Sequence, residues 1–244
     1  MLNRFTPVLA RQRRWRAASA LWLCCVVFPW SSAGGDLPGI AGAARTFETQ
    51  FERELRSRGV PGGAFAIVHG GQILRLGTYG HTDLAGSRAV DANTRFRIAS
   101  LSKGFSGVLA ASLAAEHRFT LDQPVAAFAP AFQVRQTTRP LSIEDVLGQR
   151  SGYVRNAYDN LLEAGISRSA ILPRFRTLKP LCAPGKCYSY QNNVFSLVED
   201  VVGQTLDTSF PGALEQRIFR PLGMMEASIG HEGLVAAENH AVPH

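Results

Sequence analysis

The chain has 244 residues, of which 45% are hydrophobic and 18% are charged, and its formal net charge is +7. Five of the positive charges are arginines in the first 16 residues, where no acidic residue occurs, so the rest of the chain carries only +2. This small surplus, without a basic stripe interleaved with aromatic residues, argues against a nucleic-acid-binding protein.

The N-terminal segment has the composition of a secretory signal peptide. Its arginines precede an apolar run at residues 17–30 that is too short to cross a bilayer comfortably. Small residues at Ser31-Ser32-Ala33 follow, as a cleavage site requires. We therefore expect a signal peptide at 1–33, a mature domain at 34–244 and a periplasmic or secreted protein. An uncleaved inner-membrane anchor is the alternative.

The first elements of the mature chain read as a helix followed by a hairpin. Residues 43–58 predict an amphipathic helix, because large apolar side chains recur there at every fourth position. Residues 63–69 and 72–79 predict two strands, and Gly70-Gly71 between them is a hairpin signal. Residues 94–98 predict a third short strand.

Ser100 and Lys103 stand where this third strand gives way to a helix. Residues three apart lie on one face of a helix, so the hydroxyl and the amine can meet, and the amine can take the serine proton. The alternative is that Ser100 is a helix N-cap. A capping box would place Glu or Gln at position 103, and a cation in the first turn opposes the helix dipole. We therefore interpret the pair as a nucleophile and its base.

The helix expected after Ser100 has a bulky apolar stripe on one side and mostly small residues on the other. The stripe comprises Leu101, Phe105, Val108, Leu109 and Leu113. Such a helix can be covered on both faces. Farther along, the chain predicts helices at residues 142–147, 157–164, 193–202 and 211–219.

The cysteines offer a disulfide but no metal site. Cys24 and Cys25 leave with the signal peptide, while Cys182 and Cys187 remain and flank Ala-Pro-Gly-Lys. In an oxidising compartment this pair would close a short loop as a disulfide, and a free pair is the alternative. The six histidines are scattered without ligand spacing, which disfavours a metal centre.

A second candidate element surrounds Tyr190 and Asn192, which lie just before an expected helix that begins near Val194. A phenol and an amine with lowered pKa values can share one proton near neutral pH. The alternative is that Tyr190 is a packed aromatic residue and Asn192 a helix cap.

These motifs together resemble the class C β-lactamases and their penicillin-binding and esterase relatives. Residues 96–103 read Phe-x-Ile-Ala-Ser-x-Ser-Lys, like the nucleophile segment of that family. Residues 190–195 match a Tyr-x-Asn element with an aromatic residue three positions after the asparagine. Weaker matches at residues 121–125 and 221–224 extend the resemblance over about residues 61–224.

The resemblance implies an α/β (α+β) fold of the β-lactamase/DD-peptidase type, with a helical lobe, an antiparallel-sheet lobe and an active site between them. It implies a serine hydrolase without a cofactor that forms an acyl-enzyme on Ser100. Lys103 and Tyr190 would move the proton, and Asn192 would bind the lysine and the substrate amide. The substrate would be a β-lactam, a D-alanyl peptide of peptidoglycan or a small ester. We expect no nucleic-acid partner, and membrane contact only through an uncleaved signal segment.

Two positions depart from the family pattern. Gln149 stands where relatives usually have histidine, and we interpret it as a residue that shapes a loop. His231-Glu232-Gly233 has the letters of the third family motif but follows residues 221–224 so closely that we interpret it as a surface turn. In the family, a later strand carries this motif and supplies one oxyanion donor. We therefore expect a domain that lacks its C-terminal strands, and a chain that is inactive or nearly so as it stands.

A function of a different class remains open from the sequence. A non-catalytic β-lactamase-like module that binds peptidoglycan or a protein partner would keep the motif residues without turnover. Covalent labelling by a penicillin or a fluorophosphonate distinguishes the two, because only the hydrolase has a reactive serine.

Overall fold

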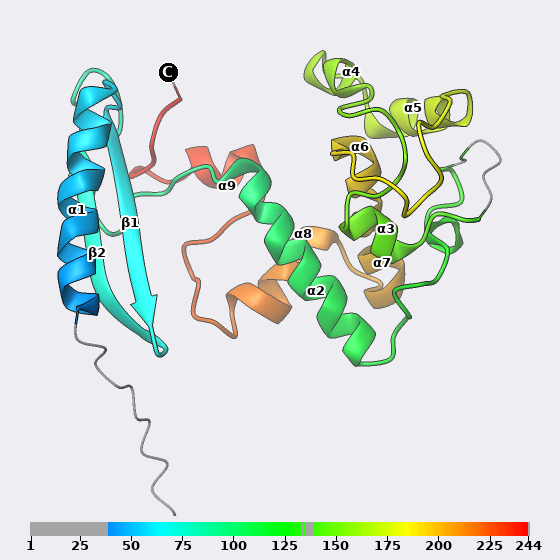
Figure 1. Ribbon diagram of the computed structural model, residues 1–244, viewed down its shortest axis with the longest axis horizontal. Helices are drawn as coiled ribbons and strands as arrows, with labels where there is room; N and C mark the ends of the chain where they lie inside the picture. The colour runs from blue at the N-terminus through cyan, green and yellow to red at the C-terminus, as the bar shows by residue number, and fades with distance from the viewer. Residues whose placement is uncertain (1–38, 133, 135–138, 244) are drawn as a thin grey trace, which may run out of the picture. The chain divides into compact units, whose positions relative to one another are not determined.

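The computed structural model describes residues 39–132, 134 and 139–243 (Figure 1). The predicted signal peptide at 1–33, with Cys24 and Cys25, lies outside these residues. Nearly all of these residues belong to one compact unit, Ala41–His244. Among the described residues, none of the helices has both the length and the apolar character needed to cross a bilayer.

The N-terminal helix and hairpin form as predicted. Helix α1 (Ile40–Ser57) is followed by strands β1 (Gly62–His69) and β2 (Gln72–Gly80), which pair antiparallel through Gly70 and Gly71 at positive φ. Within the described residues this sheet has two strands.

Aromatic rings join α1 to the hairpin. Phe65 of β1 packs edge-on against Phe47 and Phe51 of α1, with ring centroids 5.0 Å apart in each pair. A Cβ at Gly77 of β2 would lie 2.3 Å from the Phe65 ring, so glycine is required there to seat it. The regularly spaced apolar side chains that predicted the helix therefore form the face of α1 that covers the sheet.

The prediction of a third strand at residues 94–98 is wrong. Only Arg95 forms a bridge, with His240, through the hydrogen bonds from Arg95 N–H to the Asn239 carbonyl and from the Ala241 N–H to the Arg95 carbonyl. The side chain of Thr94 also reaches Asn239, at 2.9 Å. The side-chain pattern of this segment is strand-like, but the segment pairs with its neighbour at a single residue. It therefore forms no continuous series of strand hydrogen bonds.

Helix α2 (Lys103–Ala115) buries only part of the predicted apolar stripe, because Leu109 and Leu113 are fully buried and Phe105 is partly buried. Its buried positions are Ser106, Leu109, Ala110 and Leu113. Leu101 and Val108 are 77% and 61% exposed. The buried positions follow the i, i+3, i+4, i+7 rule, Val108 falls on the opposite side of the helix, and Leu101 precedes the helix.

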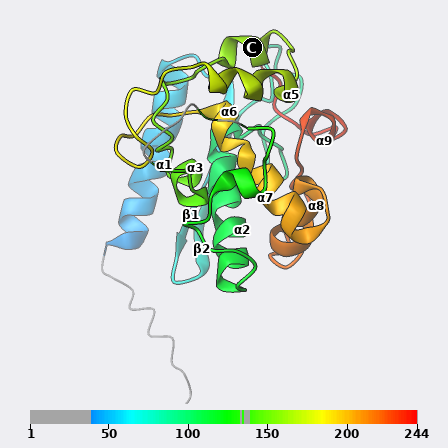
Figure 2. The same cartoon turned by 90° about the vertical axis from the view of Figure 1, so that its right-hand side faces the viewer.

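The remaining helices form the helical part of the domain, and α2 belongs to it because it lies beside α7 and α8 (Figures 1 and 2). The four regions predicted as helical are all helical, but 193–202 and 211–219 are each divided in two. The bounds are α3 (Ile143–Leu147), α4 (Asp159–Glu163), α5 (Arg168–Ile171), α6 (Asn192–Phe195), α7 (Leu197–Leu206), α8 (Phe210–Leu214), a π-helical turn (Glu215–Phe219) and α9 (His231–Val235).

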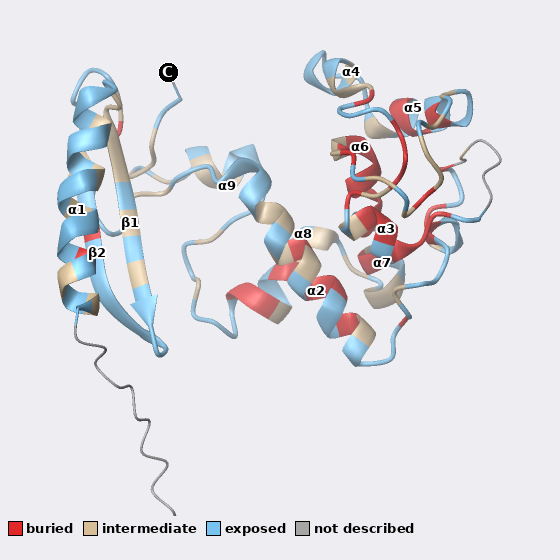
Figure 3. Ribbon diagram, in the orientation of Figure 1, coloured by how far each residue is buried: buried red, intermediate tan, exposed pale blue. Residues whose placement is uncertain are grey.

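The hydrophobic core lies in this helical part, as the red segments around α3, α6 and α7 show (Figure 3). At its centre Phe175 is fully buried and contacts the rings of Phe132, Tyr153 and Tyr158, with centroids 5.0–5.6 Å apart. The loops that carry the candidate site residues are attached to this packed body.

Candidate active site

The candidate nucleophile, Ser100, lies between residues 94–98, which pair with the C-terminal segment at Arg95, and helix α2. Ser100 is in a 3-10 turn (Ala99–Ser102) rather than in the helix itself, and Lys103 is the first residue of α2. Ala99 has a φ of 45°, a left-handed conformation that is uncommon for alanine. Strain of this kind beside a reactive residue is typical of functional sites. The Lys103 Nζ lies 3.2 Å from the Ser100 Oγ, so the two groups meet as the sequence predicted.

Tyr190, which lies just before α6, and Asn192, the first residue of α6, reach the same point. The Tyr190 hydroxyl donates to the Ser100 Oγ at 2.6 Å, and the Asn192 Oδ1 accepts from the Lys103 Nζ at 2.8 Å. The Lys103 Nζ also lies 5.0 Å from the centre of the Tyr190 ring and 5.3 Å from that of Phe195. The structure therefore brings together all four residues that the sequence singled out as catalytic.

Gln149 shapes the loop that carries Tyr190. Its backbone carbonyl accepts from the Ser189 N–H at 2.8 Å, and its side-chain Oε1 accepts from the Gln191 N–H at 2.7 Å. The residues on both sides of Tyr190 are thus held by one buried glutamine, which itself has a φ of 57°. The Asn156 N–H holds the Tyr190 carbonyl at 2.9 Å. This geometry agrees with the loop-shaping interpretation of Gln149.

The electrostatic environment favours a reactive tyrosine. Burial has the largest single influence on the pKa of Tyr190 and raises it. Hydrogen bonds with Lys103 and Ser100 and the positive charge of Lys103 outweigh burial, so the pKa of Tyr190 is lowered from its ordinary value of 10.0. A lowered phenol pKa is what a proton acceptor working near neutral pH needs.

Sequence reasoning missed Asp159, the first residue of α4. The Asn192 Nδ2 donates to its Oδ2 at 2.7 Å, and the Asn193 Nδ2 donates to its Oδ1 at 3.2 Å. Asp159 lies 33 positions before Asn192 and belongs to none of the motifs, so no spacing in the sequence marked it.

A cavity of about 920 Å³ opens beside the nucleophile. Ser100 and Lys103 line it, together with apolar side chains such as Phe105, Phe219 and Leu234. This volume is within the range of about 300–1,000 Å³ that is usual for small-molecule sites.

His231 also lines this cavity. It is exposed and begins the short helix α9, so the interpretation of residues 231–233 as a surface turn is wrong in its geometry. Within the described part of the chain, no group of His, Cys, Asp or Glu side chains is arranged to hold a metal ion.

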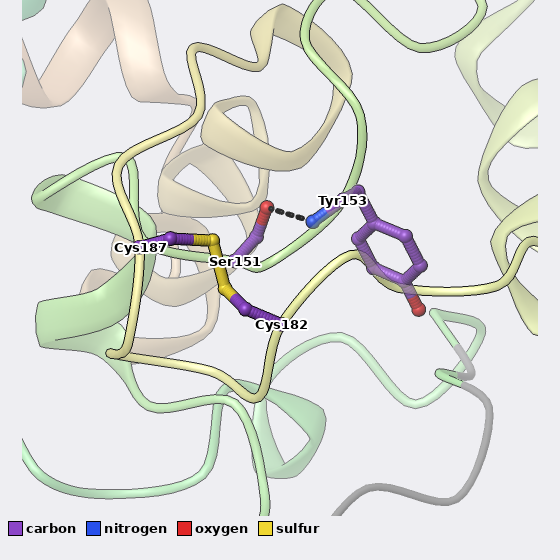
Figure 4. The surroundings of a disulfide bond; sticks show 4 residues. All are labelled: Ser151, Tyr153, Cys182 and Cys187. Carbon is purple, nitrogen blue, oxygen red and sulfur yellow. Dashed lines mark hydrogen bonds between the residues drawn. A yellow bond between two sulfur atoms is a disulfide. The ribbon is translucent and has the colours of Figure 1, made fainter.

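The expected disulfide is present, and Figure 4 shows it beside Ser151 and Tyr153. Cys182 and Cys187 are bonded, with their Cα atoms 6.3 Å apart. A Cβ at Gly152 would lie 2.2 Å from the Cys182 carbonyl oxygen, so glycine allows the two loops to approach. The Gly152 carbonyl accepts from the Leu181 N–H at 2.8 Å, which ties the disulfide loop to the residues that follow Gln149.

The beta-lactamase family model matches residues 46–244, which include the whole constellation around Ser100. The chain belongs to the beta-lactamase family. D-aminopeptidases of Brucella canis and Brucella anthropi are 32% and 31% identical to it, each over 176 residues that make up 69% of this chain and 33% of the relative. The chain thus spans about a third of the length of these curated relatives.

Three solved structures share the fold. A penicillin-binding protein homologue from Pyrococcus abyssi matches with a TM-score of 0.70 at 20% identity, over 81% of this chain and 47% of that one. A class C beta-lactamase matches with a TM-score of 0.66 at 22% identity, over 82% and 55%. EstCE1, a hydrolase with promiscuous acyltransferase activity, matches with a TM-score of 0.70 at 18% identity, over 82% and 56%. The predicted β-lactamase/DD-peptidase-like fold is therefore confirmed.

Proposed function

We propose that this protein is a serine hydrolase that forms an acyl-enzyme on Ser100. The observation that carries the proposal is that the Ser100 Oγ lies within hydrogen-bond distance of both the Lys103 Nζ and the Tyr190 hydroxyl. A serine hydroxyl becomes a useful nucleophile when an adjacent group can take its proton, and two such groups converge on this oxygen. The named hydrolases among the relatives support the same reaction class.

In the acylation step, the Ser100 Oγ attacks the carbonyl carbon of the substrate and its proton passes to the Lys103 and Tyr190 pair. To accept it, the pair must hold one proton fewer than its fully protonated form, and the lowered pKa of Tyr190 favours that state. The bond to the leaving group then breaks, and the pair returns the proton to the departing amine or alcohol. In deacylation, water gives its proton to the same pair and attacks the ester, and Ser100 regains a proton.

The substrate class we propose is a β-lactam, a D-alanyl or other D-amino-acid peptide, or a small ester. The peptide option is supported by the name of the curated relatives, which are D-aminopeptidases. Asn192, held between Lys103 and Asp159, would present its amide to the substrate amide. We further propose an exported protein with its signal peptide at 1–33, because the Cys182–Cys187 disulfide is suited to an oxidising compartment.

The test is covalent labelling with a fluorophosphonate, followed by mass spectrometry of the labelled peptide. In a full-length version of the protein, which serves as wild type, Ser100 should carry one adduct, and Ser100→Ala should carry none while melting at the same temperature. Ser102→Ala is the matched control, because Ser102 lies in the same turn but its Oγ donates to the Ala99 carbonyl at 2.6 Å. That variant should still be labelled. A wild-type protein that reacts with neither a fluorophosphonate nor a penicillin, yet binds peptidoglycan, would instead be a binding module.

A further inference from the structure

The four candidate catalytic residues and Asp159 form one connected chain of hydrogen bonds. Tyr190 donates to the Ser100 Oγ, and Lys103 donates both to that oxygen and to the Asn192 Oδ1. The Asn192 Nδ2 then donates to the Asp159 Oδ2 at 2.7 Å. The carboxylate is thus joined to the nucleophile through Asn192 and Lys103.

The chemistry of the carboxylate fixes which way the Asn192 amide faces. An ionised carboxylate only accepts hydrogen bonds, so the group of Asn192 that faces Asp159 must be its NH₂. The opposite end of the amide, the carbonyl oxygen, is therefore turned toward Lys103. Without Asp159 only the hydrogen bond from Lys103 opposes a half-turn of the amide, which would bring its NH₂ to face the lysine, donor against donor.

Asp159 is itself held in place. Its Oδ1 accepts from the Asn193 Nδ2 at 3.2 Å, and the same nitrogen donates to the Ala157 carbonyl at 2.9 Å. Asn193 is 2% exposed, so this anchor belongs to the packed body of the helical part. Among the described residues Asp159 forms no ion pair, and its negative charge is therefore not neutralised by a neighbouring cation.

We propose that Asp159 is a positioning residue, which acts through Asn192 to aim the Lys103 amine at the Ser100 hydroxyl. The proposal rests on the proposed hydrolase function. A merely structural role, in which Asp159 only fastens α4 to α6 through Asn193, predicts that its replacement changes stability alone. The two roles differ in what happens to the reacting groups.

The carboxylate has a second, electrostatic consequence that supplies a readout. Lys103 and Asp159 are the charged groups that act on Tyr190, and the Asp159 charge opposes ionisation of the phenol. Removing that charge lowers the pKa of Tyr190 further. The acid limb of the pH–rate profile, which reports the proton acceptor, therefore moves to lower pH.

The experiment compares the rate of fluorophosphonate labelling as a function of pH in the full-length protein as wild type and in its Asp159→Asn and Asp159→Ala variants. The asparagine variant can still accept from Asn192, so we expect its plateau rate within about threefold of wild type and its acid limb at lower pH. The alanine variant loses the acceptor, so we expect labelling to be about tenfold slower at equal folded fraction. Asp200→Asn is the matched control, because Asp200 pairs with Arg168 in the same helical part. It should leave both the rate and the limb unchanged.

Titration of Tyr190 by NMR of ¹³Cζ-labelled tyrosine, assigned with Tyr190→Phe, gives a readout that needs no activity. Its midpoint should fall in Asp159→Asn relative to wild type. An unlabelled wild type would refute the hydrolase proposal, and the midpoint would still test the electrostatic link. If Asp159→Ala does not fold, the positioning role is tested by the acid limb of the pH–rate profile and by the Tyr190 titration midpoint, both measured in Asp159→Asn. An unmoved limb and midpoint, or an alanine variant that is labelled at the wild-type rate, would overturn the positioning role.

Discussion

Replacement of Gln149 by alanine should destabilise the loop that carries Tyr190. The Gln149 Oε1 accepts from the Gln191 N–H at 2.7 Å, and both residues are buried, 8% and 1% exposed. Alanine leaves that buried N–H without its partner, which costs about 1–3 kcal/mol of the free energy of unfolding. In a domain of this size each kcal/mol lowers the melting temperature by roughly 2–4 °C, so a loss near 2 kcal/mol lowers it by about 4–8 °C.

The assay is thermal and urea unfolding followed by circular dichroism, with Gln204→Ala as the matched control. Gln204 is exposed and donates one hydrogen bond to the Phe128 carbonyl, so its loss should change stability by no more than about 0.5 kcal/mol. Gln149→Gly also loses the acceptor but relieves the positive φ of 57°, so it should melt between Gln149→Ala and wild type. A Gln149→Ala protein that melts with wild type would refute the reasoning, because the buried N–H would then have found another partner.

Three further variants probe the site and its support. Lys103→Arg should abolish labelling of the nucleophile, because arginine stays protonated and cannot take a proton; near wild-type labelling would contradict the role of the lysine. Asp145→Ala should cost about 2–4 kcal/mol, since Asp145 closes the capping box of α3 and pairs with Arg139 at 2.6 Å. Burial raises the pKa of Asp145, but its hydrogen bonds, the one from Arg139 foremost, outweigh burial and lower it. The stabilisation is therefore complete above the ordinary value of 3.8 and lost as the pH falls through the lower folded-state pKa, which urea unfolding against pH will show and a flat profile would disprove. Joint replacement of Cys182 and Cys187 by serine should cost about 2 kcal/mol through the entropy of the opened loop, and an unchanged urea midpoint would count against this.

The elements that the sequence predicted well are those fixed by neighbours in the chain. The hairpin of β1 and β2 needed only Gly70-Gly71 between two strand-like runs, and its partner strands adjoin each other. The strand predicted at residues 94–98 failed because a strand also needs a partner. Arg95 finds one only at His240, and only for a single residue. A pairing that distant in the chain leaves no local signal.

Long-range contacts also divided a helix that the sequence predicted as continuous. The apolar pattern of residues 193–202 continues through Ser196, but the structure ends α6 at Phe195 and begins α7 at Leu197. Arg168 donates to the Ser196 carbonyl at 3.2 Å and to its hydroxyl at 2.6 Å, and it pairs with Asp200. The arginine of α5 thus contacts both the junction and the helix that follows it. Nothing in the apolar pattern records this contact.

The candidate site likewise contains residues that a sequence motif identifies and one residue, Asp159, that only the folded structure identifies. Ser100 and Lys103 were predictable because they stand three residues apart in the sequence, at the start of an expected helix. Tyr190 and Asn192 were predictable because they belong to one short motif. Asp159 has no such signal, because it meets Asn192 and Asn193 only through hydrogen bonds between residues more than 30 positions apart in the chain. A carboxylate in the first turn of a helix is ordinary in sequence. Asp159 gains a role because its carboxylate only accepts hydrogen bonds and therefore faces the NH₂ of Asn192. The carbonyl oxygen of Asn192 is then turned toward Lys103.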